Sequence, residues 1–255
     1  MLVSRRAGAL TAWGNAYLKG SSSLDEAAAA VVGDDVLHRV LGVPGEADAV
    51  TLAVALGRLR ASGVRGLRLV LPEPGDLVGM PGPATLSADA AVRGAAVLTV
   101  GDLTTESWAL LATAGTSVDA LRWDVVRADR SVPPHGLPTL SEAERALSEA
   151  LRDTTDALDV LEVARGRDDV AARLSAIDKD LRRIDLPASL PARAQRMVAT
   201  ATRLLGVVSI AAETDGSAVT ASVADQRRAA LRTLRTTARY ALCAAYSAAL
   251  EPPGR

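Results

Sequence analysis

Hydrophobic residues recur every three or four positions at the start of the chain and through most of its second half, as on one face of a helix. Near the N-terminus this spacing joins Leu10, Trp13 and Tyr17 and predicts an amphipathic helix. In the second half it predicts helices over residues 141–164, 168–184, 192–214 and 222–250. Such helices with short connections predict an antiparallel, up-down-up-down bundle.

The last of these predicted helices has the longest apolar face in the sequence. That face is formed by Leu231, Leu234, Ala238, Leu242, Ala245 and Ala249. An arginine stripe runs beside it, formed by Arg228, Arg232, Arg235 and Arg239. Their spacing places the guanidinium groups within an arc of about 60°, so they share one face at the edge of the apolar seam.

Predicted helices and strands alternate over the first 130 residues. Helices are expected over residues 23–32 and 47–62, and Ser87 can cap a short helix through Arg93. Strands are expected over residues 67–71, 96–100, 107–113 and 120–127, with a short strand or irregular segment over 36–43. The order strand, helix, strand between residues 67 and 100 predicts a parallel βαβ pair, and residues 114–117 predict a hairpin turn.

Local signals mark two helix starts and one domain boundary. Ser23 with Glu26, and Ser141 with Glu144, have the spacing of a capping box. Residues 131–138 read Ser-Val-Pro-Pro-His-Gly-Leu-Pro, which no helix or strand tolerates.

The expected domains are therefore a mixed α/β domain over 1–130, a proline-rich linker over 131–140 and a four-helix bundle over 141–251. The predicted fold class is an α+β or α/β N-terminal domain with a small mixed sheet, followed by an all-α antiparallel helical bundle.

Charge and composition argue against several classes of function. The formal net charge is −1 and the sequence pI is near 6.2, whereas a nucleic-acid-binding domain normally carries a basic excess. No apolar run approaches the roughly 18 residues needed to cross a bilayer, so a membrane protein is not expected. Cys243 is the single cysteine, which excludes an intrachain disulfide and favours a reducing, cytoplasmic location.

The first candidate site is the loop over residues 72–83, which is rich in proline and glycine. Glu73 and Asp76 lie in this loop, and Asp102 follows the next predicted strand. If the two strands are parallel, these three carboxylates converge at one edge of the sheet and can bind a hard cation or another ligand. The alternative is an ordinary solvated loop whose acids cap turns.

The second candidate site is the arginine stripe, which could bind an acidic partner or an anionic ligand. An acidic stripe of Glu142, Glu149, Asp153 and Asp156 lies on the first helix of the predicted bundle, on its solvent side. The alternative is that both stripes are solvated faces with local ion pairs such as Asp178 with Arg182.

Other reactive residue types favour structural roles. No nucleotide-binding, metal-protease or Cys-x-x-Cys motif occurs, and no cofactor is indicated. His38 is typical of a core or strand-edge position and His135 of a linker, although either could serve a catalytic dyad. Cys243 is expected to be a small apolar residue rather than a reactive thiol. Trp108 and Trp123 are expected to pack in a core or between domains rather than to form a ligand platform.

The segments 13–17 (Trp-Gly-Asn-Ala-Tyr), 24–27 (Leu-Asp-Glu-Ala) and 190–196 (Leu-Pro-Ala-Arg-Ala-Gln-Arg) resemble an alanine-rich family of uncharacterised actinobacterial proteins. The resemblance covers most of the chain. It implies no activity and transfers no functional residue.

Together these patterns favour a cytoplasmic, non-enzymatic interaction or regulatory protein that binds an acidic partner through its C-terminal helix. The alanine-rich helices are also compatible with a homo-oligomer that forms through them. The alternative function is small-molecule or metal-dependent binding or catalysis at an inter-domain cleft near the 72–83 loop.

Overall fold

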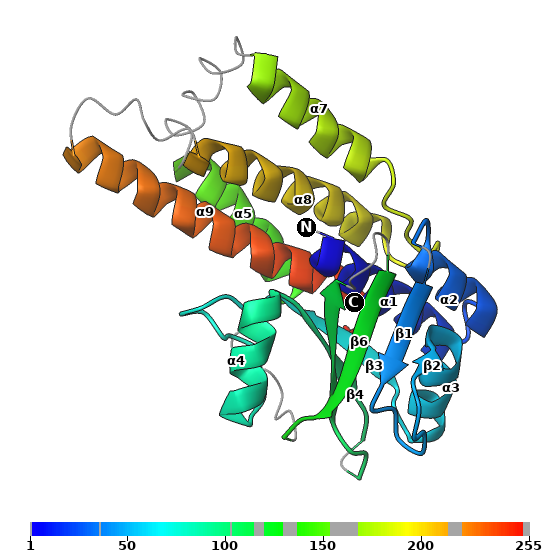
Figure 1. Ribbon diagram of the computed structural model, residues 1–255. Coiled ribbons are helices and arrows are strands. Elements are labelled where there is room, and N and C mark those ends of the chain that lie inside the picture. Colours follow the sequence, from blue (N-terminus) through cyan, green and yellow to red (C-terminus); the bar gives the residue numbers. More distant parts are fainter. Residues whose placement is uncertain are drawn as a thin grey trace. The chain divides into compact units, whose positions relative to one another are not determined.

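The computed structural model describes residues 2–35, 37–102, 104–114, 120–129, 137–153, 168–213 and 221–251 (Figure 1). The chain divides into two compact units. Unit 1 consists of Met1–Leu137, Asp185–Pro191 and Tyr246–Arg255, and unit 2 of Pro138–Ile184 and Ala192–Ala245. Unit 1 thus includes two short segments from the part of the sequence predicted to be a helical bundle.

Unit 1 is built on a mixed sheet. Its strands in the described part of the chain are β1 (Leu37–Leu41), β2 (Val50–Thr51), β3 (Gly66–Val70), β4 (Ala96–Val100), β5 (Trp108–Ala114) and β6 (Ala120–Arg127). Their spatial order is β2-β1-β6-β5-β4-β3. Strands β1 and β6 pair in parallel, and the other neighbours pair antiparallel. The predicted hairpin of β5 and β6 is confirmed as an antiparallel pair, so the sheet and its helices form an α+β unit.

The predicted parallel pairing of β3 with β4 is wrong. These strands are antiparallel, with Gly66 opposite Val100 and Val70 opposite Ala96. The reason lies in the 72–83 loop, which carries the chain along the sheet so that Gly82 O accepts a hydrogen bond from Asp129 N beyond the end of β6 (2.8 Å). Helix α4 (Ala84–Arg93) then returns in the opposite direction. Because the connection traverses the sheet twice, β4 starts at the end where β3 stopped.

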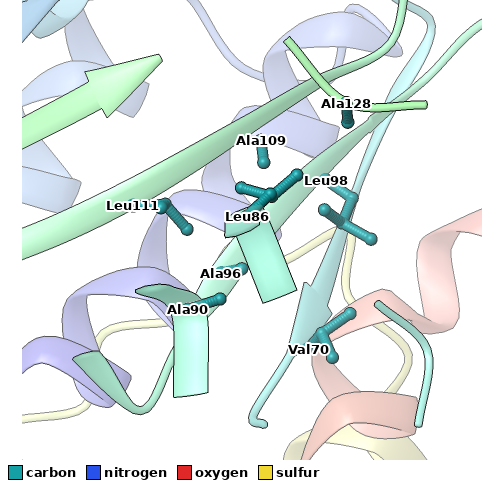
Figure 2. Packing of buried hydrophobic residues seen from close by; sticks show 8 residues of the cluster. All are labelled: Val70, Leu86, Ala90, Ala96, Leu98, Ala109, Leu111 and Ala128. Atoms are coloured by element: carbon teal, nitrogen blue, oxygen red, sulfur yellow. The ribbon is translucent and has the colours of Figure 1, made fainter. Parts of the chain in front are cut away.

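Helix α4 covers part of one face of the sheet. Its side chains Leu86 and Ala90 pack on the β3, β4 and β5 side of that face (Figure 2). The cluster is completed by Val70, Ala96, Leu98, Ala109, Leu111 and Ala128. Ser87 does not cap this helix, because α4 begins three residues earlier; the buried Ser87 hydroxyl donates to Pro81 O (3.0 Å).

Helices α1 (Leu2–Leu18), α2 (Leu24–Val32) and α3 (Leu52–Ala61) pack with the other face. Gly14 of α1 lies directly against Leu67, because a Cβ atom there would be 2.4 Å from Leu67 Cδ1. The predicted capping box of Ser23 and Glu26 at the start of α2 is confirmed. Helix α3 starts later than the pattern predicts, because the residues before it pair with β1 as strand β2.

The described elements of unit 2 are helical: α5 (Leu140–Asp153), α7 (Asp168–Leu181), α8 (Ala192–Glu213) and the main part of α9 (Ala221–Ser247), which the short 3-10 turn η2 (Ala248–Leu250) follows in unit 1. The capping box of α5 is formed by Thr139 and Glu142, not by Ser141 and Glu144. Glu142 N donates to Thr139 Oγ1 (3.3 Å), and Thr139 N donates to Glu142 Oε2 (2.9 Å). The remainder of the predicted 141–164 helix lies outside the described residues.

Helices α7 and α8 form an antiparallel pair. Arg173 forms an ion pair with Glu213 (2.8 Å), and Asp178 forms one with Arg203 (2.9 Å). Residue numbers therefore increase along one helix as they decrease along the other. Gly206 allows close approach between these ion pairs, because a Cβ atom there would lie 2.5 Å from Ile177 Cδ1. Asp178 thus makes an interhelical ion pair, in place of the expected local pair with Arg182.

Strand β3 is an edge strand, and side chains take the place of a further strand beside it. Asn15 Oδ1 accepts from Leu67 N (2.7 Å) and Asn15 Nδ2 donates to Leu67 O (2.8 Å). Ser247, which lies between the predicted seam residues Ala245 and Ala249, accepts from Leu69 N through its hydroxyl (3.1 Å). Asn15 is completely buried, so these bonds close the edge against solvent and against other strands.

Replacing Asn15 with leucine is expected to lower the free energy of unfolding by about 2–6 kcal/mol, because two buried backbone groups of Leu67 lose their partners at about 1–3 kcal/mol each. Urea unfolding followed by circular dichroism measures the change. Thr11→Val on the same helix is the matched control. Thr11 is equally buried, and its hydroxyl donates only to Ala7 O within the helix (2.8 Å), so this variant should lose less than about 1 kcal/mol. Equal losses in the two variants would contradict the assigned role of Asn15.

Candidate functional site

Glu73 and Asp76 of the 72–83 loop close a tight turn through their backbone groups. Glu73 N donates to Asp76 O (3.0 Å) and Asp76 N donates to Glu73 O (2.9 Å), across Pro74 and Gly75. Gly75 has φ of +88°, a conformation that glycine adopts without strain. Asp76 Oδ1 also accepts from Val78 N (3.4 Å).

Asp102 follows β4, and Glu73 follows β3. Because these strands are antiparallel, Asp102 lies at the end of the sheet opposite to that of Glu73. Its Oδ1 atom accepts bonds from the hydroxyl and amide of Thr104 (2.7 and 3.0 Å) and from those of Thr105 (2.9 and 3.1 Å). These bonds, led by the Thr104 hydroxyl, lower the pKa of the exposed Asp102 carboxyl to about 2. Asp102 therefore caps its own loop.

The expected convergence of Glu73, Asp76 and Asp102 is consequently wrong. Within the described ranges, no three histidine, cysteine, aspartate or glutamate side chains are placed to hold a metal ion. The alternative interpretation, that these acids cap turns, agrees with the hydrogen bonds of Asp76 and Asp102.

The arginine stripe of α9 divides into an exposed part and a buried residue. Arg228, Arg232 and Arg235 are exposed, and Arg228 forms an ion pair with Asp225 one turn earlier (2.8 Å). Arg239 is only 4% exposed, and its guanidinium carbon lies 5.8 Å from the centre of the Tyr240 ring. The stripe predicted from spacing is therefore a surface at its first three positions only.

The burial of α9 changes along its length, which explains this division. From Asp225 to Arg235, where burial is described, only the predicted seam residues Leu231 and Leu234 are buried. From Ala241 to Tyr246 every residue is buried, so the helix there is surrounded on all sides. Cys243 lies in this stretch as a buried free thiol, as expected for a small apolar residue.

Unit 1 contains a buried polar cluster that no sequence motif reveals. Arg6 of α1 forms a two-pronged ion pair with Asp35, with Nε to Oδ2 at 2.6 Å and Nη2 to Oδ1 at 2.7 Å. His38 Nε2 lies 2.9 Å from Asp35 Oδ2, and Trp123 Nε1 donates to His38 Nδ1 (3.3 Å). Gly33 leaves room for the guanidinium, because a Cβ atom there would lie 2.6 Å from Arg6 Nη1.

These contacts fix the state of the imidazole. Because the Trp123 indole can only donate, Nδ1 of His38 must accept, and Nε2 must carry the proton that is donated to Asp35. Burial lowers the pKa of His38 and outweighs its bond to Asp35, so the ring is neutral near pH 7. Burial alone would raise the pKa of Asp35, but the hydrogen bonds from Arg6 and His38 lower it. Both nitrogens of His38 are engaged, which suits a structural role better than proton transfer to a substrate.

The other candidate residues remain apart from this cluster. Trp123 is fully buried as expected, and Trp108 is half-buried. Glu142, Glu149 and Asp153 of the acidic stripe are exposed, as predicted. His135 and Asp156 lie outside the described residues.

Comparison with known proteins supplies a family. The model of the Rv1486c-like protein N-terminal domain matches residues 7–137, and that of the C-terminal domain matches residues 141–243. The chain belongs to the Rv1486c-like protein family. The boundary between the two matches falls in the proline-rich segment that separates the predicted domains.

Two relatives of this Rv1486c-like chain come from Mycobacterium tuberculosis. Uncharacterized protein Rv1486c of strain ATCC 25618 / H37Rv is 29% identical over 286 residues, covering 95% of this chain and 96% of the relative. Uncharacterized protein MT1533 of strain CDC 1551 / Oshkosh has the same identity and coverage. No solved structure matches the chain. The resemblance to an uncharacterised actinobacterial family is thus confirmed, and the names of these Rv1486c-like relatives state no activity.

Sequence reasoning missed Arg6 and Asp35. The available signal was the short spacing from Asp35 to His38 at the junction of a helix and a strand, but an ion pair from Arg6, 29 positions before Asp35, leaves no local pattern.

For the helices of this Rv1486c-like chain, hydropathy gives one further result: none in the described ranges is both long and apolar enough to cross a membrane.

The free energy of unfolding is expected to fall as the pH drops below 6.5, the ordinary pKa of histidine. The folded pKa of His38 is lowered, so the unfolded chain binds more protons in this window and acid favours unfolding. Urea unfolding at pH 7.5 and 5.5 measures the effect. His38→Gln should remove most of the difference between the two pH values, whereas His135→Gln should retain it. A difference of equal size in His38→Gln would show that another group is responsible.

Reversing Arg239 to glutamate is expected to lower the free energy of unfolding by at least about 2 kcal/mol, because it places a carboxylate in a buried position. Arg232→Glu, on the exposed part of the same helix, should change it by no more than about 0.5 kcal/mol. Thermal or chemical unfolding compares the two variants. Equal effects would contradict the division of the stripe.

Proposed function

We propose that the protein is a cytoplasmic, non-enzymatic interaction protein that binds an acidic partner through the exposed face of α9. The observation that carries the proposal is the exposure of Arg228, Arg232 and Arg235 on one face of a helix whose Leu231 and Leu234 are buried. The helix is held by its apolar side, so these arginines are presented from a fixed support rather than from a loop.

The charge of the helix supports an acidic partner. Helix α9 contains five arginines, one aspartate and no lysine or glutamate. A guanidinium group presents planar paired donors that match a carboxylate, and its positive charge persists at any physiological pH. The pair of Arg228 with Asp225 is largely exposed, with side chains 52% and 70% accessible. Such pairs contribute little to stability, so a partner carboxylate can replace Asp225 at small cost.

Arg239 is left out of the proposed binding set, since its burial removes it from a partner's reach. The binding surface is therefore the helix face from Arg228 to Arg235, which spans about 10 Å at 1.5 Å per residue. A partner helix with acidic residues at matching intervals fits this surface.

Two further features belong to the same proposal. The first is that α5, α7, α8 and α9 together form an antiparallel bundle, supported by the antiparallel pairing of α7 with α8. The second is self-association through the alanine-rich helices. In contrast, a metal or small-molecule site near the 72–83 loop lacks support, because the three acids that suggested it lie at opposite ends of β3 and β4.

The double variant Arg232→Glu/Arg235→Glu is expected to lose the partners that co-purify with the full chain from its native cell. The reason is that two attractive contacts with carboxylates become repulsive, which should weaken binding at least tenfold. Affinity purification with quantitative mass spectrometry measures the loss.

The matched control is Arg65→Glu/Arg145→Glu, which changes the net charge equally at two exposed positions outside α9. This control should retain the partners, and both double variants should have thermal midpoints close to that of the parent chain. If partners stay bound to Arg232→Glu/Arg235→Glu, the arginine face is merely solvated and the proposal fails.

A further inference from the structure

Part of the sheet in unit 1 has an uncovered face. Helix α4 packs on the β3, β4 and β5 side of one face and reaches Asp124 of β6 through Arg93, whereas β1 stands clear of it in Figure 1. The burial pattern agrees. Alternate residues of β1 and β6 that point away from the core are exposed, including Leu37 (46% exposed), Arg39, Arg122 and Val126 (36% exposed).

Two arginines lie side by side at the centre of this face. Arg39 of β1 is directly opposite Arg122 of β6 in the parallel register, and Arg122 is opposite Thr113 of β5. Directly paired residues project to the same side of a sheet, so the two guanidinium groups share one surface. Like charges directly opposite each other destabilise a sheet, and an anion between them would relieve this repulsion.

The charges around the pair leave one arginine uncompensated. Asp124 accepts from Arg122 Nε (2.8 Å) and from Arg93 Nη1 (2.8 Å), and Asp89 accepts from the other nitrogens of Arg93 (both 2.9 Å). No hydrogen bond or ion pair joins the Arg39 side chain to any residue in the described ranges. The face therefore has a surplus positive charge at its centre.

Apolar side chains flank that charge along the strand. Leu37 and Leu41 precede and follow Arg39 on the same side of β1, and Val126 lies on the same side of β6. At about 3.3 Å per residue, the run from Leu37 to Leu41 is about 13 Å long. An isolated inorganic anion would satisfy the arginines but would leave the apolar side chains exposed.

We propose that the open face of β1 and β6 is a docking surface for an acidic protein segment, whose carboxylate binds between Arg39 and Arg122 and whose flanking apolar side chains contact Leu37, Leu41 and Val126. This surface belongs to unit 1 and is independent of the arginine face of α9. The occupant is recognised by a pattern of apolar, acidic and apolar residues at alternate positions of an extended segment. That pattern matches both the charge and the spacing of β1.

The probe is the capped peptide acetyl-Leu-Ser-Glu-Ser-Leu-amide, which places leucine, glutamate and leucine on one side when extended. It is titrated into the ¹⁵N-labelled full chain, and amide shifts report where it binds. The expected result is saturable shifts in β1 and β6, with binding at least tenfold weaker for the peptide that contains glutamine in place of glutamate. Arg39→Gln/Arg122→Gln should weaken binding to the same extent, and Leu37→Ser should weaken it severalfold.

Arg39→Gln alone provides a folding control, because it removes a like-charge contact and should leave the thermal midpoint unchanged or raised. Arg232→Glu/Arg235→Glu should leave peptide binding unchanged, which separates this proposal from that for α9. Equal binding of the glutamate and glutamine peptides, or equal binding to Arg39→Gln/Arg122→Gln, would overturn it. Amide shifts confined to α9 would also overturn the proposal. The same would hold if sodium phosphate at matched ionic strength gave the same β1 and β6 shifts at equal or higher affinity.

Discussion

The edge of a sheet exposes backbone groups that must be hydrogen-bonded, and the architecture of unit 1 depends on how β3 meets this constraint. Asn15 supplies both a donor and an acceptor to Leu67, and Ser247 supplies an acceptor to Leu69. Gly14 lets α1 approach closely enough for its neighbour Asn15 to reach the strand. The segment Trp-Gly-Asn-Ala-Tyr that suggested the family thus has a physical role: Trp13 bonds to Asp185 O (3.2 Å), Gly14 permits the approach, and Asn15 closes the edge.

Local periodicity predicted most elements, because helix and strand periods are properties of short segments. The start of α2 at Ser23 and the pairing of β5 with β6 follow from neighbouring residues alone. The pairing of β3 with β4 could not be predicted in this way. The direction of β4 relative to β3 depends on the path of the 72–83 loop. The bond from Asp129 to Gly82 marks a path along the sheet, and it joins residues that are distant in the sequence. The cap of α5 was misplaced for a simpler reason, since Thr139 with Glu142 and Ser141 with Glu144 have the same spacing. Helix α4 follows Pro83, which makes no side-chain cap bond and so leaves no capping motif in the sequence.

The candidate sites show the same limit. Spacing identified the arginine face of α9 because a helix converts sequence intervals directly into angles, but burial is decided by what surrounds the helix, and spacing alone could not separate Arg239 from Arg232. The ion pair of Arg6 with Asp35 and the row formed by Arg39 and Arg122 each join segments far apart in the chain. Such pairs follow from strand order and register, which the sequence of one chain does not specify.

Helix α9 runs without interruption from Ala221 to Ser247, yet Ala245 belongs to unit 2 and Tyr246 to unit 1. The segment Asp185–Pro191 also belongs to unit 1, so the chain passes between the units four times. Unit 1 begins first during synthesis, but its last segment is synthesised after unit 2. Strand β3 leaves the ribosome early, whereas the carbonyl that bonds to Trp13 emerges midway through the helical unit and the hydroxyl that bonds to Leu69 emerges after it. Unit 1 can therefore complete this edge, at Leu69, only after the helical unit has been synthesised.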